Sequence, residues 1–159
     1  MTQPEVKNLA ASVKARLANL ARAQREDFQE LLSRYGRERL LYRLSVSEYR
    51  ERFILKGALL FAYWTGAPHR PTRDVDLLGH GAPEIAVLEE VFRDLCKMEV
   101  QPDGLGFQPD SVKGERIKDD EEYEGNAQYQ DEGLLRRLEC EPGILIRWSD
   151  SLQGGQDNL

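Results

Sequence analysis

Two aspartates one residue apart, Asp74 and Asp76, lie in the stretch PTRDVDLLG, whose other residues are mostly apolar or turn-forming. The stretch predicts the start of a buried strand, in which alternate residues share a face. Asp74 and Asp76 are therefore expected to project together, while Val75 and Leu77 point into the core. Two carboxylates this close repel one another unless a cation lies between them, and Mg²⁺ prefers such oxygen ligands. The pair indicates either a metal site or a solvated strand end with Arg73 as a counter-ion.

The segment before the aspartates, FILKGALLFAYWTGAPHRPT, adds a second constraint. Residues 53–55 predict a brief strand ending at Gly57, and ALLFAYWTG predicts a helix that stops at Gly66. A glycine at this point lets the backbone approach a phosphate, and the N-terminus of the helix offers free N–H groups to an anion. Lys56 adds a positive charge beside the glycine. The unit therefore predicts a compact site for phosphates and a metal.

These motifs resemble the AbiEii/AbiGii toxin family of nucleotidyltransferases, within the DNA polymerase β-like superfamily. The family pattern reads Phe-x-Leu-Lys-Gly-Gly, followed by Arg-x-Ser/Thr-x-Asp-x-Asp-Leu. The matching residues are Phe53, Leu55, Lys56, Gly57, Arg70, Thr72, Asp74, Asp76 and Leu77. Ala58 stands where the second small residue of the pattern usually falls, and it is small enough to keep the backbone accessible.

The resemblance implies an α+β fold. This fold is a minimal nucleotidyltransferase core, a mixed β-sheet with flanking helices, preceded by an N-terminal helical segment. The chain would divide into a helical segment over residues 1–52, the nucleotidyltransferase core over 53–125 and a divergent or truncated tail over 126–159. Apolar residues at three- and four-residue spacing after a cap at Asn8 also predict helices in the first third. The stretch LGFQPDSVKGERI is expected to form two short strands or a hairpin around Pro109–Ser111.

The activity that the resemblance implies is Mg²⁺-dependent transfer of a nucleotide from an NTP to an acceptor such as tRNA. Members of this family are toxins of bacterial type IV toxin–antitoxin and phage-abortive systems, so a cognate antitoxin protein is an implied partner. Carried over by position, Asp74 and Asp76 would be the catalytic, metal-binding residues. The nucleotide-binding residues would be Lys56, Gly57, Ala58 and Arg73.

The recognisable motifs end near residue 125. The family continues with an apolar-Asp-apolar strand that supplies a third carboxylate, and no such pattern follows Asn126 here. GILIRWSD predicts a late strand that could offer Asp150, although its spacing fits poorly. We therefore expect a truncated or frameshifted end. The alternative to an active transferase is a catalytically incomplete member, acting at most as a nucleotide- or metal-binding module. A glycosyltransferase that uses Asp-x-Asp is a weaker alternative, because it leaves the LKGA unit unexplained.

Composition limits the class of protein further. The chain has 159 residues, 40% hydrophobic and 31% charged, which is typical of one globular domain. No run approaches the roughly 18–20 apolar residues of a membrane span, and no signal peptide is visible, so a cytoplasmic location is expected. Residues 1–56 carry 12 basic and 7 acidic side chains, whereas the remainder carries 10 and 21. The basic part could face RNA or nucleotide phosphates, or form the solvated faces of helices.

Overall fold

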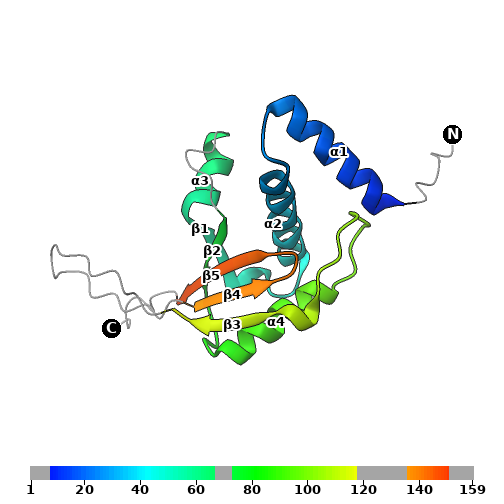
Figure 1. Cartoon of the computed structure of the whole chain (residues 1–159). Coiled ribbons are helices and arrows are strands. Elements are labelled where there is room, and N and C mark those ends of the chain that lie inside the picture. Colours follow the sequence, from blue (N-terminus) through cyan, green and yellow to red (C-terminus); the bar gives the residue numbers. More distant parts are fainter. Residues whose placement is uncertain (1–7, 67–72, 118–135, 151–159) are drawn as a thin grey trace, which may run out of the picture.

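The first part of the chain is a pair of helices, as the apolar spacing predicted. The computed structural model describes residues 8–66, 73–117 and 136–150 (Figure 1). Helix α1 (Leu9–Gln24) begins after Asn8, whose side chain accepts a hydrogen bond from the backbone of the first turn, so the expected cap is confirmed. Helix α2 (Phe28–Val46) is continuous. In Figure 1, α1 lies beside α2 and away from the sheet.

The remaining elements build a mixed sheet with further helices. Within the described residues, the strands lie in the order β1-β2-β5-β4-β3. Strand β5 runs parallel to β2, and the other neighbouring pairs are antiparallel. The strands are β1 (Phe53–Lys56), β2 (Asp74–Gly79), β3 (Lys113–Arg116), β4 (Arg136–Cys140) and β5 (Ile144–Asp150). The helices are α3 (Gly57–Thr65), α4 (Ile85–Lys97) and two 3₁₀ turns, η1 (Arg50–Arg52) and η2 (Pro109–Ser111).

One face of the sheet is buried against α2 and α4. Leu40 of α2 and Leu88 of α4 belong to the same apolar cluster as Leu77 and Ile146 of the sheet. Both Leu88 and Ile146 are completely buried. Among the described residues, the opposite face carries mostly charged side chains and is here called the open face. The fold therefore confirms the α+β class.

The segment after α4 is anchored on α2 through Asp103. Its carboxylate accepts hydrogen bonds from Nε of Arg39 at 2.7 Å and Nη1 of Arg43 at 2.9 Å, and its carbonyl accepts one from the hydroxyl of Tyr35 at 2.6 Å. Burial alone would raise the pKa of Asp103, but hydrogen bonds from Arg43 and Arg39 outweigh it and lower the pKa. Because Arg43 is itself buried, this ion pair ties α2 to the rest of the fold.

The second half of the sheet differs from the sequence-based expectation. The two short strands or hairpin expected around Pro109–Ser111 are wrong, because these residues form the 3₁₀ turn η2 and are followed by the single strand β3. The partner of β3 is β4, which comes about twenty residues later in the chain. A strand was expected in GILIRWSD and is confirmed as β5, which lies between β2 and β4. Residues 136–150, placed in the tail by the sequence, thus complete the sheet.

Candidate functional site

Asp74 and Asp76 lie on the open face of β2. Burial alternates along the strand, with both aspartates half-buried and Val75 and Leu77 almost completely buried on the other face. The expectation that the two carboxylates share a face is therefore confirmed. Strand β2 is not an edge strand, since β1 flanks it on one side and β5 on the other.

A row of charged residues crosses the open face at the level of Asp76. Lys56 of β1 lies directly opposite Asp76, and Arg147 of β5 lies opposite it on the other side. Arg137 of β4 is in turn opposite Arg147, and it pairs with Glu115 of β3, whose carboxylate accepts a hydrogen bond from Arg137 Nε at 3.0 Å. The acidic pair is thus flanked by a cation on each neighbouring strand.

The environment of Asp76 disfavours its charge. Burial raises the pKa of this carboxyl, the charges of Arg147 and Lys56 lower it, and the charge of Asp74 raises it, so that the net shift is upward. Arg147 also approaches Asp74 directly, with 4.0 Å between Nε and Oδ2. An added cation would stabilise the charged form of a half-buried carboxylate that lies next to a second carboxylate.

Gly57 brings the start of α3 against Asp76. Its φ of +74° is left-handed, and a Cβ atom there would lie only 2.6 Å from Oδ2 of Asp76. A glycine is therefore needed for both the backbone conformation and the close approach. Lys56 is the N-cap residue of α3 and makes no side-chain capping bond to the helix. The next residue, Ala58, is exposed in the first turn.

The structure places Arg73 differently from the other expected site residues. Its exposed side chain pairs with Glu30 of α2, at 3.1 Å between Nη2 and Oε1. Its carbonyl accepts a hydrogen bond at 3.4 Å from Nη1 of Arg37, which is buried below the start of β2. Burial lowers the pKa of Arg37, and its Nε has no hydrogen-bond partner among the described residues. Arg73 therefore contacts α2, whereas Lys56, Gly57 and both aspartates converge.

Two residues near the acidic pair were missed by the sequence reasoning. Arg147 lies in ILIRWSD, where alternation with Ile146 would have placed it on a polar face without indicating which strand it faces. Arg37 has no distinguishing signal, because its burial depends on how α2 packs on β2. Other residues weighed in the sequence, Arg70, Thr72 and the third-carboxylate candidates after residue 117, lie outside the described residues. The exception is Asp150, whose backbone pairs with Gly79, three residues beyond Asp76.

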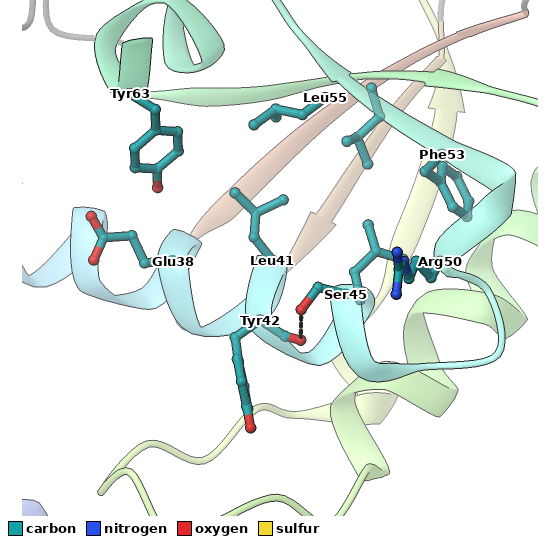
Figure 2. A pocket seen from close by; sticks show the side chains of 10 residues that line it. Glu38, Leu41, Tyr42, Ser45, Arg50, Phe53, Leu55 and Tyr63 are labelled. Carbon is teal, nitrogen blue, oxygen red and sulfur yellow. Dashed lines mark hydrogen bonds between the residues drawn. The ribbon is translucent and has the colours of Figure 1, made fainter. Parts of the chain in front are cut away.

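An apolar cavity of about 400 Å³ lies on the other side of the sheet. Phe53, Leu55 and Leu77 contribute to it from the buried face of β1 and β2, so it is separate from the acidic pair. Figure 2 shows Tyr63 of α3 pointing toward Glu38 of α2 at one end of the cavity, with Phe53 and Arg50 at the other end. The lining residues are Glu38, Leu41, Tyr42, Leu44, Ser45, Arg50, Phe53, Leu55, Tyr63 and Leu77.

The two carboxylates of the open face suit a metal ion whose remaining ligands come from a substrate. Among the residues that the structure describes, no group of three or more His, Cys, Asp or Glu side chains is arranged to hold a metal ion. Asp74 and Asp76 supply two hard oxygen ligands on one face, and Mg²⁺ is commonly held by one or two carboxylates together with substrate phosphates.

In the described part of the chain, no helix has the length and apolarity needed to cross a membrane.

Comparison with protein families gives a match to this chain. A family model described as "Nucleotidyl transferase AbiEii toxin, Type IV TA system" matches residues 39–146. The match begins in α2, contains the whole β1-Gly57-α3-β2 unit and ends inside β5. It thus runs beyond residue 125, where the recognisable motifs end. A search of curated proteins found no match.

Proposed function

Because the chain belongs to the AbiEii family of nucleotidyl transferase toxins from type IV toxin–antitoxin systems, we propose that Asp74 and Asp76 are the catalytic, metal-binding residues of a nucleotide transfer. The observation that carries this proposal is their position: both carboxylates share the open face, and Gly57 holds the N-terminus of α3 against Asp76. The substrate would be an NTP, and the acceptor a nucleic acid such as tRNA.

The proposed cation is Mg²⁺. The half-buried, mutually repelling carboxylates favour a divalent ion, and the space that a Cβ atom would fill at Gly57 is left to Asp76. When bound, Mg²⁺ would supply the positive charge that phosphoryl transfer requires at the α-phosphate and the leaving pyrophosphate.

The protein's own residues would position the nucleotide. The first-turn N–H groups of α3, which receive no side-chain cap from Lys56, would donate to phosphate oxygens. Lys56 would add positive charge beside Asp76, and Ala58 would leave the first turn accessible. Arg73 is a weaker candidate for phosphate contact, because it would have to leave Glu30.

The remaining expectations accompany this proposal. Residues 53–125 would form the nucleotidyltransferase core, to which β4 and β5 add strands, and residues 1–52 would form the helical segment before it. A cognate antitoxin would be the protein partner. The protein would act in the cytoplasm, because that is where its NTP substrate is available. None of these points depends on the identity of the acceptor.

A second candidate function is a binding module without turnover. The observation that favours it is Arg147, which lies opposite Asp76 on the neighbouring strand, so that the open face offers a cation there and not a further carboxylate. Such a protein would bind a metal and a nucleotide through Asp74 and Asp76 but would not complete the transfer.

Incubation with Mg²⁺, each α-³²P-labelled NTP and total bacterial RNA separates the two candidates. The comparison needs an Asp74→Ala/Asp76→Ala variant and a matched control, Asp94→Ala. This control removes a carboxylate of α4 that accepts a hydrogen bond from the hydroxyl of Tyr49. Label transfer by the wild type and Asp94→Ala alone would support the transferase. Nucleotide binding without transfer, lost in the double variant, would support the binding module. Transfer by the double variant would overturn both.

A further inference from the structure

Arg147 lies beside the acidic pair, and the proposed nucleotide transfer gives it no role. It lies opposite Asp76 in the parallel register of β2 and β5, and its Nε is 4.0 Å from Oδ2 of Asp74. Both side chains are partly exposed, at 42% for Arg147 and 30% for Asp74, so solvent can reach the contact. The guanidinium of Arg147 therefore lies near both carboxylates.

The row of charges across the sheet explains why Arg147 faces the acids. Its neighbour on the other side is Arg137 of β4, directly opposite in the antiparallel register. Like charges directly opposite one another on adjacent strands are destabilising. Arg137 is compensated by Glu115, with which it forms an ion pair. Arg147 is left to the acidic side of the row, where its favourable partners are Asp74 and Asp76.

The flanking cations balance the charge of the acidic pair. Lys56 on β1 and Arg147 on β5 lie opposite Asp76 on its two sides, and Arg147 also forms the 4.0 Å contact with Asp74. A divalent ion entering between these carboxylates would meet Arg147 as a like charge. The ion therefore has to overcome an interaction that already exists in the metal-free protein.

We propose that Arg147 acts as a built-in counter-ion that weakens divalent metal binding in the nucleotide-free protein, so that the metal binds together with the nucleotide. The phosphates of a metal–nucleotide complex give the guanidinium a new anionic partner, which a bare ion does not. This inference rests on the proposed function, because it takes Asp74 and Asp76 as the metal ligands. Arg147 would act through Asp74 and Asp76, and it would make binding of the metal depend on binding of the nucleotide.

The test is direct titration of the protein with Mn²⁺ alone, with free Mn²⁺ followed by electron paramagnetic resonance. The variants are Arg147→Gln, which removes the charge, Arg147→Lys, which keeps it, and Arg137→Gln, which makes the same charge change one strand farther away. Asp74→Asn/Asp76→Asn removes the proposed ligands. Circular dichroism would verify that each variant folds, as the partial exposure of Arg147 leads us to expect.

The expected result is a Mn²⁺ dissociation constant about fivefold lower for Arg147→Gln, since two unit charges 4 Å apart in a high-dielectric environment interact by about the equivalent free energy. Arg147→Lys and Arg137→Gln should remain within about twofold of the wild type. Adding a non-hydrolysable NTP analogue should tighten Mn²⁺ binding more in the wild type than in Arg147→Gln.

Three outcomes would overturn the inference. If Arg147→Gln binds Mn²⁺ like the wild type while the double asparagine variant does not bind, the metal site stands and Arg147 is not its counter-ion. If Arg137→Gln tightens binding as much as Arg147→Gln, the effect is one of net charge and does not belong to Arg147. If no variant binds Mn²⁺, with or without the analogue, the proposed function fails together with the inference.

Discussion

Replacing Gly57 with alanine tests whether the start of α3 must lack a side chain for Asp76 to occupy its position. Gly57 has a φ of +74°, a conformation that L-residues rarely adopt. The added Cβ would lie 2.6 Å from Oδ2 and 3.2 Å from both Cβ and Cγ of Asp76. Rotation of the carboxylate alone would not relieve the contacts to Cβ and Cγ. The backbone or the aspartate would therefore have to shift.

The magnitude follows from two contributions. A non-glycine residue in the left-handed region costs roughly 1–2 kcal/mol, and an extra methyl group forced into a filled space costs about 1–3 kcal/mol more. We therefore expect Gly57→Ala to reduce the free energy of unfolding by about 2–5 kcal/mol. Because the displaced group is the carboxylate of Asp76, Mn²⁺ affinity should fall as well.

Gly66, at the other end of α3, is a matched control. Its φ is +68°, but a Cβ atom there would meet no atom of the described residues within 4 Å. Gly66→Ala should therefore show the backbone contribution alone, roughly 1–2 kcal/mol, and leave Mn²⁺ affinity unchanged. Urea unfolding at pH 7, followed by circular dichroism, measures both variants, and the Mn²⁺ titration supplies the second readout.

Equal destabilisation by the two alanines would refute the reasoning, because it would mean that the space beside Gly57 is not filled by Asp76. Unchanged Mn²⁺ affinity in a destabilised Gly57→Ala protein would separate the two arguments. The close approach would then be structural and would not set the position of a metal ligand.

Three further substitutions probe other parts of the fold. Asp103→Ala should destabilise the protein by about 3 kcal/mol at pH 7 in urea unfolding, because it leaves the buried Arg43 unpaired. Since the pKa of Asp103 is lowered by its hydrogen bonds, its stabilising effect is present above the ordinary aspartate pKa of about 3.9 and is lost as the pH falls through the folded value. The difference from the wild type should therefore shrink in acid, and a constant difference would contradict this. Ile146→Ala should cost about 2–5 kcal/mol in the same assay, whereas Ile54→Ala, at a half-exposed position, should cost less than about 0.5 kcal/mol; similar values would show that Ile146 is not in the core. Asp76→Asn should raise the thermal midpoint of the metal-free protein by about 2–4 °C, since it removes a half-buried charge beside a like charge, and a lower midpoint would show that Asp76 stabilises the fold.

The unit from β1 to β2 could be predicted from the sequence because each of its signals is local. The alternation around Val75 and Leu77 determines which face the aspartates share, whatever the strand pairs with. The glycine at position 57 marks the junction of a strand and a helix, and the structure has this junction there. These features depend on neighbours within a few residues, which is the range over which side-chain spacing is informative.

The far side of the sheet could not be predicted in the same way. The stretch around Pro109–Ser111 contains turn-forming residues between apolar ones, a pattern that fits both a hairpin and a 3₁₀ turn followed by a single strand. What decides between them is the distant β4, which supplies the partner of β3. Strand pairing over such a separation is a tertiary interaction, and the spacing of neighbouring residues does not predict it.

The register of β5 decides what Arg147 does, and this is the property furthest from the sequence. Alternation in ILIRWSD places Arg147 on the opposite face from Ile146, which is completely buried. Its effect on the acids, however, depends on β5 lying beside β2 with Arg147 opposite Asp76. A slip of one residue would turn every side chain of the strand to the other face, burying the arginine and exposing the isoleucine. Burial of the apolar face therefore fixes the register of β5, and this register places Arg147 beside Asp74. An arginine that is unremarkable in the sequence thus belongs to the candidate site because Ile146 must be buried.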